Sequence, residues 1–288
     1  MKHGYAALFA LLALVSQPSQ PVASEPAPAE MLRVPGGSFT MGADGIGERD
    51  EQPAHTVTLA GFWLDRTEVT NQSYLECVAA GKCAPFRDDV ARRFGAGPEV
   101  GFRQPQQPVV GVSFIDASSY CAFRGKRLPR EAEWERAARG SDGRSFAWGD
   151  QKPSPTLACY GRKPGAKGAT TDPVGSHPAG AGPYGHLDLT GNVWEWTSDL
   201  YDPIAYRRPG AATGVPGSCA EVLETQNWLR KTKQQGFTGK NPIPTVCERV
   251  LRGGAFNYDA AGLRASNRVH HPEDWRMLVA GFRCAKDE

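Results

Sequence analysis

LDLTGNVWEWTSD, residues 187–199, is the most informative stretch of this chain. It places Asp188 and Glu195 on either side of a Gly-Asn pair, and Glu195 lies between Trp194 and Trp196. Carboxylate and carbonyl oxygens in a tight loop are the ligands that a hard cation such as calcium prefers. The same pattern is also typical of a turn followed by a strand with two core tryptophans. These residues alone therefore leave both interpretations open.

Five further segments accompany this stretch along the chain. They are VPGGSFTMG (34–42), DRTEVTNQSY (65–74), GKRLPREAEWERAARG (125–140), LRGGAF (251–256) and GFRCA (281–285). Together the six segments resemble the formylglycine-generating enzyme, or sulfatase-modifying factor, family from about Arg33 to the C-terminus. The resemblance implies the formylglycine-generating-enzyme fold, which is C-type-lectin-like. We therefore expect a loop-rich α+β domain with few short helices and short strands, stabilised by disulfides and calcium.

The composition is that of a loop-rich globular domain. The chain has 288 residues, of which 40% are hydrophobic and 22% charged, enough to bury one large core or two modest ones. Its 33 glycines and 23 prolines are spread along the sequence, which favours ordered loops over a disordered tail. The net charge of +2, without a block of like charges, argues against nucleic acid or a membrane surface as a partner.

The N-terminus has the pattern of a secretory signal. Lys2 and His3 precede an apolar run from Tyr5 to Val15, and small residues follow near Ser24. The run is too short to span a bilayer as a helix, which needs about 20 residues. We predict a signal peptide at 1–24, a flexible leader at 25–32 and a sulfatase-modifying-factor-like domain at 33–288, with an insertion around 201–248. The mature protein is then periplasmic or secreted, with no membrane span after signal cleavage.

Seven cysteines in an exported protein imply disulfides and one thiol left over. Cys77 and Cys83 bracket a short loop that a local bridge would close. The family resemblance implies a bridge between positions Cys121 and Cys284, tying the end of the chain to the core. Six cysteines allow 15 arrangements, and we expect Cys77–Cys83, Cys121–Cys284 and Cys219–Cys247, with Cys159 unpaired.

Local patterns predict a few short elements. Residues 55–64 alternate like a strand at their start. Helices are expected over 71–81 behind the Thr70 cap, over 113–124 and over 130–139, where early acidic and late basic residues suit the helix dipole. In the last of these, Trp134 is the expected buried anchor. The segment NWLRKTKQQG (227–236) in the insertion is a further helical candidate.

The copper ligands of the resembled family have no counterpart in this chain. That family oxidises a sulfatase cysteine to formylglycine and binds copper(I) through two cysteines just after the RGG-type motif. Thiolates suit copper(I) because it is a soft ion. The corresponding positions here are Tyr258 and Leu263. We therefore expect no copper and no copper-dependent formylglycine-generating activity.

The calcium site of the family transfers better. The resemblance assigns the cation to Asp188, the carbonyls of Gly191 and Val193, and the Glu195 carboxylate. A second family calcium site, expected around residues 158–161, lacks its usual side-chain ligand region. Structural calcium at the first site is thus the cofactor that we expect.

The groove that the family uses for its substrate gives the candidate ligand site. Its lining would be Trp194, Tyr258, Asp259, Arg264, Ser266 and His270. Aromatic, acidic and basic groups together suit a peptide, protein or glycan ligand. His270 and His271 are adjacent, and adjacent residues rarely direct both rings at one metal ion. No catalytic residue can be assigned from these patterns.

Tyr258 and Leu263 disfavour an active formylglycine-generating oxidase. Two other functions remain open. The first is an exported ligand- or protein-binding accessory or maturation factor. The alternative is an enzyme of different mechanism on the same fold, of the oxidoreductase type that matures a peptide or a siderophore such as pyoverdine, for which the family has a periplasmic precedent. Whether the chain is an enzyme is therefore left open.

Overall fold

The computed structural model describes residues 1, 30–87, 101–163, 169–208, 210–211, 217–234 and 245–288. The predicted signal peptide (1–24) lies outside these residues except for Met1, as do most of the leader and parts of the 201–248 insertion. In the described part of the chain, no helix is long and apolar enough to cross a membrane.

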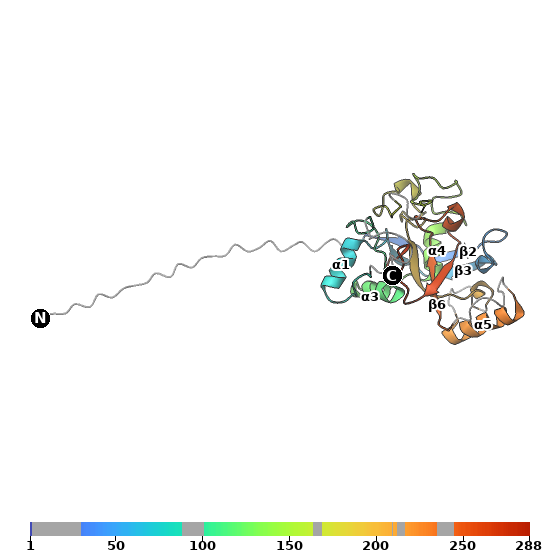
Figure 1. Ribbon diagram of the computed structural model, residues 1–288. Coiled ribbons are helices and arrows are strands. Elements are labelled where there is room, and N and C mark those ends of the chain that lie inside the picture. The colour runs from blue at the N-terminus through green and yellow to red at the C-terminus, as the bar shows by residue number, and fades with distance from the viewer. Residues whose placement is uncertain (2–29, 88–100, 164–168, 209, 212–216, 235–244) are drawn as a thin grey trace.

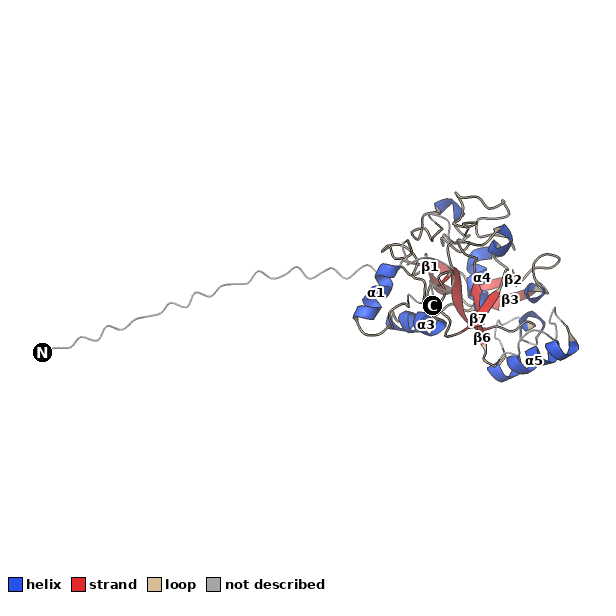
Figure 2. Cartoon of the chain, in the orientation of Figure 1, coloured by secondary structure: helices blue, strands red, loops and turns tan. Residues whose placement is uncertain are grey.

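The regular elements are short and separated by long loops. The helices are α1 (Asn71–Ala79), α3 (Phe114–Phe123), α4 (Glu131–Arg139) and α5 (Cys219–Thr232). The strands are β1 (Met31–Val34), β2 (Gly37–Met41), β3 (His55–Leu59), β4 (Phe62–Asp65), β5 (Trp194–Leu200), β6 (Glu248–Arg252), β7 (Val269–Pro272), β8 (Ala280–Gly281) and β9 (Ala285–Asp287). Figure 2 shows the strands gathered in the middle of the molecule, with helices and loops around them.

Three small sheets form the framework. One has the order β1-β4-β9, a second is the β2-β3 hairpin, and the third has the order β7-β6-β5-β8. Strand β5 is central in the third sheet, where it pairs antiparallel with β6 and parallel with β8. Consequently the segments 187–199, 251–256 and 281–285, which are distant in sequence, lie side by side in the structure.

The predicted strand over 55–64 is wrong as a single element. The structure has two strands there, β3 and β4, which belong to different sheets. Val57 and Leu59 are buried in β3, whereas Phe62 and Leu64 are buried in β4. One continuous strand would point these two pairs to opposite faces, because side chains alternate with a period of two. The shift of phase between Leu59 and Phe62 therefore breaks the strand.

The local helix signals give the observed helices. Thr70 caps α1 by accepting a hydrogen bond from the Ser73 amide at 3.2 Å. Ser113 caps α3 in a reciprocal arrangement with Asp116. Trp134 in α4 is fully buried, as expected for its anchor. Helix α5 begins at Cys219, well before the predicted 227–236, and residues 235–236 lie outside the described part.

All nine residues of α4 are buried, although five of them are charged. Figure 1 shows this helix close to the strands, whereas α5 lies at the edge of the molecule. Apolar side chains form two clusters, one around Trp194, Trp196 and Phe282 and one around Trp134 and Phe62. The charged residues of α4 therefore need partners inside the protein, because an unpaired buried charge is strongly unfavourable.

Three disulfides link the loops, and all seven cysteines lie in described residues. The bridges are Cys77–Cys83, Cys121–Cys284 and Cys219–Cys247, the same pairs that the sequence analysis names. Cys121–Cys284 joins α3 to the residue before β9, across a sequence separation of 163. Cys159 is buried and unpaired.

Candidate functional site

Glu195 in β5 forms a buried ion pair with Arg283. Both side chains are 0% exposed, and the Arg283 Nε and Nη2 atoms lie 2.7 and 2.8 Å from the two Glu195 oxygens. Trp134 Nε1 also donates to Glu195 Oε2 at 2.9 Å. The remaining guanidinium N–H groups donate to the carbonyls of Asp65, Arg66 and Leu187. A guanidinium has five N–H donors, so Arg283 has none left for another carboxylate.

Asp188 and Glu68 form a second pair of buried carboxylates beside this ion pair. Asp188 Oδ2 accepts a hydrogen bond from the Gly175 amide at 2.6 Å, and Glu68 Oε1 accepts one from Asn192 Nδ2 at 3.1 Å. Burial raises the pKa of Glu68 well above its ordinary value, and the Asp188 charge raises it further. Burial also raises the pKa of Asp188. Sequence analysis gave Glu68 no role, although it lies within the TEVTN segment.

The Gly-Asn turn holds this cluster in place. Gly191 has a φ of 88°, and a Cβ atom there would lie 2.5 Å from the Cys159 carbonyl oxygen, so glycine is required. Asn192 has a φ of 60°, donates its amide N–H to Cys159 O and accepts the Phe256 amide N–H at its own carbonyl. The turn is thus fixed between the 158–162 segment and the LRGGAF segment.

Of the four predicted calcium donors, three have no hydrogen bond to the oxygen concerned among the described residues, and the fourth, Glu195, is paired with Arg283. No described group donates a hydrogen bond to Asp188 Oδ1 or to the carbonyl oxygens of Gly191 and Val193. Such oxygens are suitable calcium ligands. Both oxygens of Glu195, in contrast, are held by Arg283 and Trp134. Among the described residues no group of three or more His, Cys, Asp or Glu side chains is arranged to hold a metal, so main-chain oxygens would have to contribute.

The two positions of the family's copper ligands are filled by packed apolar groups. The Tyr258 ring lies edge-on against Trp194, with 5.2 Å between the ring centroids. Leu263 is 0% exposed, and its side chain fills the space above Gly254. Neither side chain offers sulfur to a soft metal ion. The geometry at these positions is that of a hydrophobic contact.

Cys159 does not replace the missing thiolates. Its Sγ atom lies 3.9 Å from the Thr170 carbonyl oxygen, and the residue is 2% exposed. Burial, together with the Asp172 charge, raises the pKa of the thiol to about 12. A thiol with so high a pKa is protonated at neutral pH and is a poor nucleophile and metal ligand.

The six predicted groove residues have three sets of partners. Trp194 and Tyr258 contact each other, and the neighbouring Asp259 caps the 3-10 helix Ala260–Leu263. Arg264 and Ser266 both bind the buried Glu51, at 2.6 and 2.7 Å. The His270 ring contacts Glu248 and stacks on Tyr201 with centroids 3.6 Å apart.

The two adjacent histidines face different partners. The His271 ring stacks on Trp275 with centroids 5.0 Å apart, whereas the His270 ring stacks on Tyr201. Successive residues of a strand such as β7 point to opposite faces. The two imidazoles therefore do not converge on a common metal ion.

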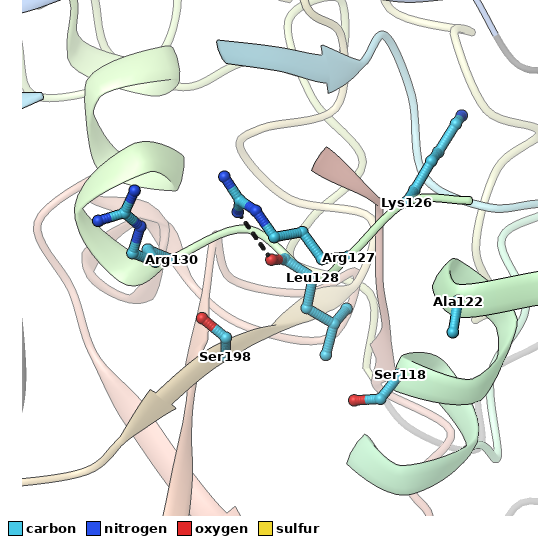
Figure 3. A pocket seen from close by; sticks show the side chains of 7 residues that line it. All are labelled: Ser118, Ala122, Lys126, Arg127, Leu128, Arg130 and Ser198. Atoms are coloured by element: carbon cyan, nitrogen blue, oxygen red, sulfur yellow. Dashed lines mark hydrogen bonds between the residues drawn. The ribbon is translucent and has the colours of Figure 1, made fainter. Parts of the chain in front are cut away.

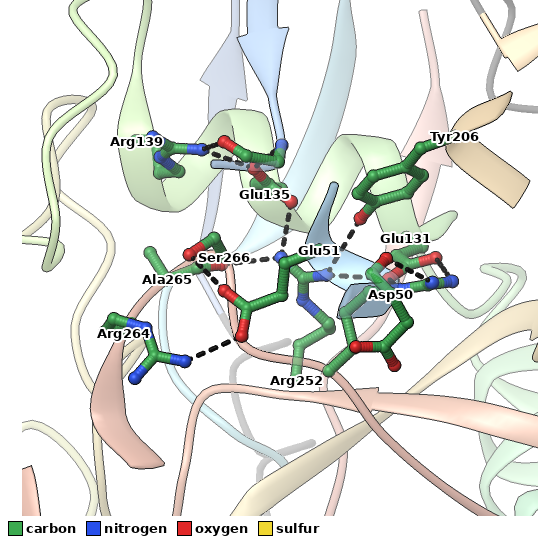
Figure 4. A network of polar contacts seen from close by, with 12 residues as sticks. Asp50, Glu51, Glu131, Glu135, Arg139, Tyr206, Arg252, Arg264, Ala265 and Ser266 are labelled. Atoms are coloured by element: carbon green, nitrogen blue, oxygen red, sulfur yellow. Dashed lines mark hydrogen bonds and ion pairs between the residues drawn. The ribbon is translucent and has the colours of Figure 1, made fainter. Parts of the chain in front are cut away.

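A buried ion-pair network holds Glu131 and Glu135 of α4 (Figure 4). Arg252 in β6 binds Glu131 and Glu135, and Arg268 binds both oxygens of Glu131 at 2.6 and 2.9 Å. Although burial alone would raise it, the pKa of Glu131 is lowered by Arg268 and Arg252. The network ties α4 to the LRGGAF strand. The residues that form it lie in two of the motifs, GKRLPREAEWERAARG and LRGGAF, and in the segment after the second.

A separate cavity of about 370 Å³ lies between α3, the segment before α4 and β5 (Figure 3). Its lining consists of Ser118, Ala122, Lys126, Arg127, Leu128, Arg130 and Ser198. The cations are each paired with a carboxylate, Lys126 with Asp65 and the two arginines with Glu133. None of the six predicted groove residues lines this cavity.

The three sheets, the buried helix α4 and the three disulfides define a domain of the formylglycine-generating-enzyme fold. A family model described as "Sulfatase-modifying factor enzyme 1-like domain" matches residues 17–288. The chain belongs to this family.

Similar proteins include active and inactive members. The chain is 34% identical to a formylglycine-generating enzyme of Streptomyces coelicolor, covering 95% of this chain and 96% of the relative. It is 38% identical to the inactive Cα-formylglycine-generating enzyme 2 of Mus musculus, covering 96% and 91%. Among solved structures, PvdO from Pseudomonas aeruginosa has a TM-score of 0.64 at 28% identity, covering 90% of this chain and 94% of that one.

Proposed function

We propose that this protein is an exported family member that is inactive as a copper-dependent formylglycine-generating enzyme and acts as a ligand- or protein-binding accessory or maturation factor. The observation that carries the first part is the packing at Tyr258 and Leu263, where the family has its copper thiolates. Similarity to the inactive mouse protein is consistent with this loss.

Two surfaces support a binding role. Tyr258, Asp259 and Arg264 remain partly exposed and offer an aromatic ring with opposite charges nearby. The cavity of Figure 3 has the size of a small-ligand site and combines Leu128 with the Ser118 and Ser198 hydroxyls. A peptide, protein or glycan suits such surfaces, because they combine apolar contact area with polar groups.

The proposal places the protein in the periplasm or outside the cell. Three disulfides support this location, because such bonds persist in oxidising compartments. N-terminal sequencing of the mature protein should give a start near residue 25. An intact Met1 in protein recovered from its native compartment would contradict signal cleavage.

The proposal also includes structural calcium at Asp188, the Gly191 and Val193 carbonyls and the Glu195 carboxylate. The availability of the first three of these groups supports it. Bound calcium would neutralise buried negative charge and hold the Gly-Asn turn, and no catalytic step depends on it.

An enzyme of different mechanism is the second candidate. Two similarities favour this second candidate. One is the similarity to PvdO. The other is 32% identity to a hercynine oxygenase of Mycolicibacterium smegmatis, covering 88% of this chain and 60% of the relative. Oxidoreductase-type maturation of a peptide or siderophore would change the mass of its substrate. A binding factor would leave the ligand's mass unchanged.

Copper(I) binding tests the loss of the parent activity. The protein and the Streptomyces coelicolor relative are titrated in parallel with copper(I) against a chromophoric chelator. We expect the relative to remove copper from the chelator and this protein to leave it bound. Stoichiometric copper transfer to this protein would overturn the proposal.

A second experiment separates binding from turnover. Peptide and glycan arrays are probed with labelled protein, and the mass of each captured ligand is then measured.

A further inference from the structure

The cavity of Figure 3 has a lining that carries positive charge and no negative charge. Its charged side chains are Lys126, Arg127 and Arg130, and none of its lining residues is Asp or Glu. Two carboxylates that pair with these cations are buried and are not part of the lining. The side chain of Asp65 is 1% exposed and that of Glu133 is 2% exposed. A ligand in the cavity therefore meets the cations and not these partners.

Arg127 and Arg130 share one buried carboxylate. Glu133 accepts from Nη1 and Nη2 of Arg127 at 2.7 and 2.9 Å, and from Nε of Arg130 at 3.2 Å. The other Arg127 donors bind Asp287 and the Leu128 carbonyl. The Asp287 side chain is 75% exposed, so water weakens its effect. A single buried negative charge thus faces two guanidinium groups, which leaves positive charge at the cavity.

Arg130 keeps donors available for a ligand. Its Nη1 and Nη2 atoms have no hydrogen-bond partner among the described residues, and its side chain is 43% exposed. The Ser118 hydroxyl likewise has no partner in the described part of the chain, whereas Ser198 donates its hydroxyl to Asp199 at 3.1 Å. Lys126 points away from the two serines in Figure 3. The two terminal nitrogens of a guanidinium match the two oxygens of a carboxylate, so Arg130 is suited to bind one.

Apolar groups complete the lining and narrow the class of ligand. Ala122 lies on α3, and the Leu128 side chain lies between Ser118 and Ser198 in Figure 3. The volume of about 370 Å³ has room for an anion together with an apolar group, since a water molecule takes up about 30 Å³ in the liquid. A neutral sugar, whose hydroxyl groups donate as well as accept, would find no carboxylate or amide side chain in this lining.

We propose that this cavity binds the C-terminal carboxylate of a peptide whose last side chain is apolar. Arg130 pairs with the carboxylate, and Ser118 supplies a second donor. The apolar side chain lies against Ala122 and Leu128. This inference rests on the binding function proposed above and names the ligand class of its cavity.

Short peptides with and without a terminal carboxylate test the assignment. Acetylated Gly-Gly-Ala, Gly-Gly-Val and Gly-Gly-Leu, each as the free carboxylate and as the carboxamide, are titrated into the mature protein by calorimetry, alongside inorganic phosphate. Charge-assisted hydrogen bonds are roughly twice as strong as neutral ones, so the tightest carboxylate should bind at least about tenfold more tightly than its carboxamide. Added salt should weaken this binding, because it screens the charges.

Variants of the lining test the role of Arg130. Arg130→Gln should weaken binding of the carboxylate at least about tenfold and leave the carboxamide unchanged. Arg130→Lys keeps the charge but loses the fork of donors, and should cause an intermediate loss. Arg66→Gln is the matched control, because Arg66 is 46% exposed and paired with Glu30 but does not line the cavity. If Arg130→Gln does not unfold cooperatively, Ala122→Leu, which fills the cavity from an exposed position of α3, should abolish binding.

The outcomes separate the ligand class from the binding function itself. Equal affinity for carboxylate and carboxamide would overturn the assignment, as would an unchanged affinity in Arg130→Gln or tighter binding of phosphate than of the peptides. If no tripeptide binds while the peptide and glycan arrays yield a ligand, only the ligand class of the cavity is wrong. Arrays without any ligand contradict the binding function.

Discussion

Replacing Arg283 by glutamine tests whether the Glu195–Arg283 pair holds the core together. The change removes both charge-assisted contacts to Glu195 and the donors to the Asp65, Arg66 and Leu187 carbonyls. Glu195 would keep only Trp134 Nε1 as a hydrogen-bond partner among the groups that now bind it. Both residues are 0% exposed, so water cannot take over these contacts.

The expected loss of stability is large. Removing one partner of a buried ion pair typically costs about 3–5 kcal/mol, because the other charge stays buried and unpaired. For a domain of this size, that corresponds to a melting temperature lowered by roughly 6–20 °C. Burial raises the pKa of Glu195, and Arg283 opposes this rise. Without Arg283 the neutral carboxyl is favoured, so the loss should be smaller at pH 5 than at pH 8.

Urea unfolding with the disulfides intact measures the effect. Arg33→Gln is the matched control, because its pair with Glu288 is exposed and should contribute only about 0–1 kcal/mol. The double variant Arg283→Gln/Glu195→Gln should lose less than the sum of the two single variants, because no unpaired charge remains. A loss below about 1 kcal/mol in Arg283→Gln at pH 8 would refute the reasoning.

Two further predictions follow from buried groups. Burial and the Glu131 charge raise the pKa of Asp199 from 3.8 to about 7; its contribution to stability is therefore present at low pH and lost as pH rises toward 7. Asp199→Asn should thus gain stability relative to wild type over that window, by up to roughly 4 kcal/mol in pH-dependent urea unfolding, and a pH-independent difference would contradict this. Alkylation of unfolded, unreduced protein should label Cys159 alone, and Cys121→Ser should cost about 2–5 kcal/mol. Recovery of labelled Cys121 from wild type would contradict the pairing.

The sequence predicted those helices whose signals come from residues close together in the chain. The caps at Thr70 and Ser113 define α1 and α3 because each satisfies an amide only three residues away. The strand over 55–64 failed because the change of face after Leu59 depends on which sheet each half joins. The start of α5 was missed although it carries a local signal, the capping box of Ser218 and Glu221.

The site was predictable only in part for the same reason. The motif around the Gly-Asn turn predicts that Asp188, Gly191, Val193 and Glu195 lie together, because they are close in sequence. The partner of Glu195 is 88 residues away, and Glu68 is 124 residues from Asn192. No local pattern reports which carboxylate receives the guanidinium. Likewise, no local pattern shows that Glu51 holds Arg264 and Ser266 or that Glu248 holds His270, because these partners are distant in sequence.

The central claim is that the family fold persists here without the family's copper oxidation. The most direct test incubates the mature protein with copper, oxygen and a peptide carrying the sulfatase cysteine motif, followed by mass spectrometry. The Streptomyces coelicolor relative serves as the positive control. Because Tyr258 and Leu263 replace the two thiolates, we expect the peptide cysteine to remain unoxidised. Copper-dependent formation of formylglycine by this protein would contradict the account.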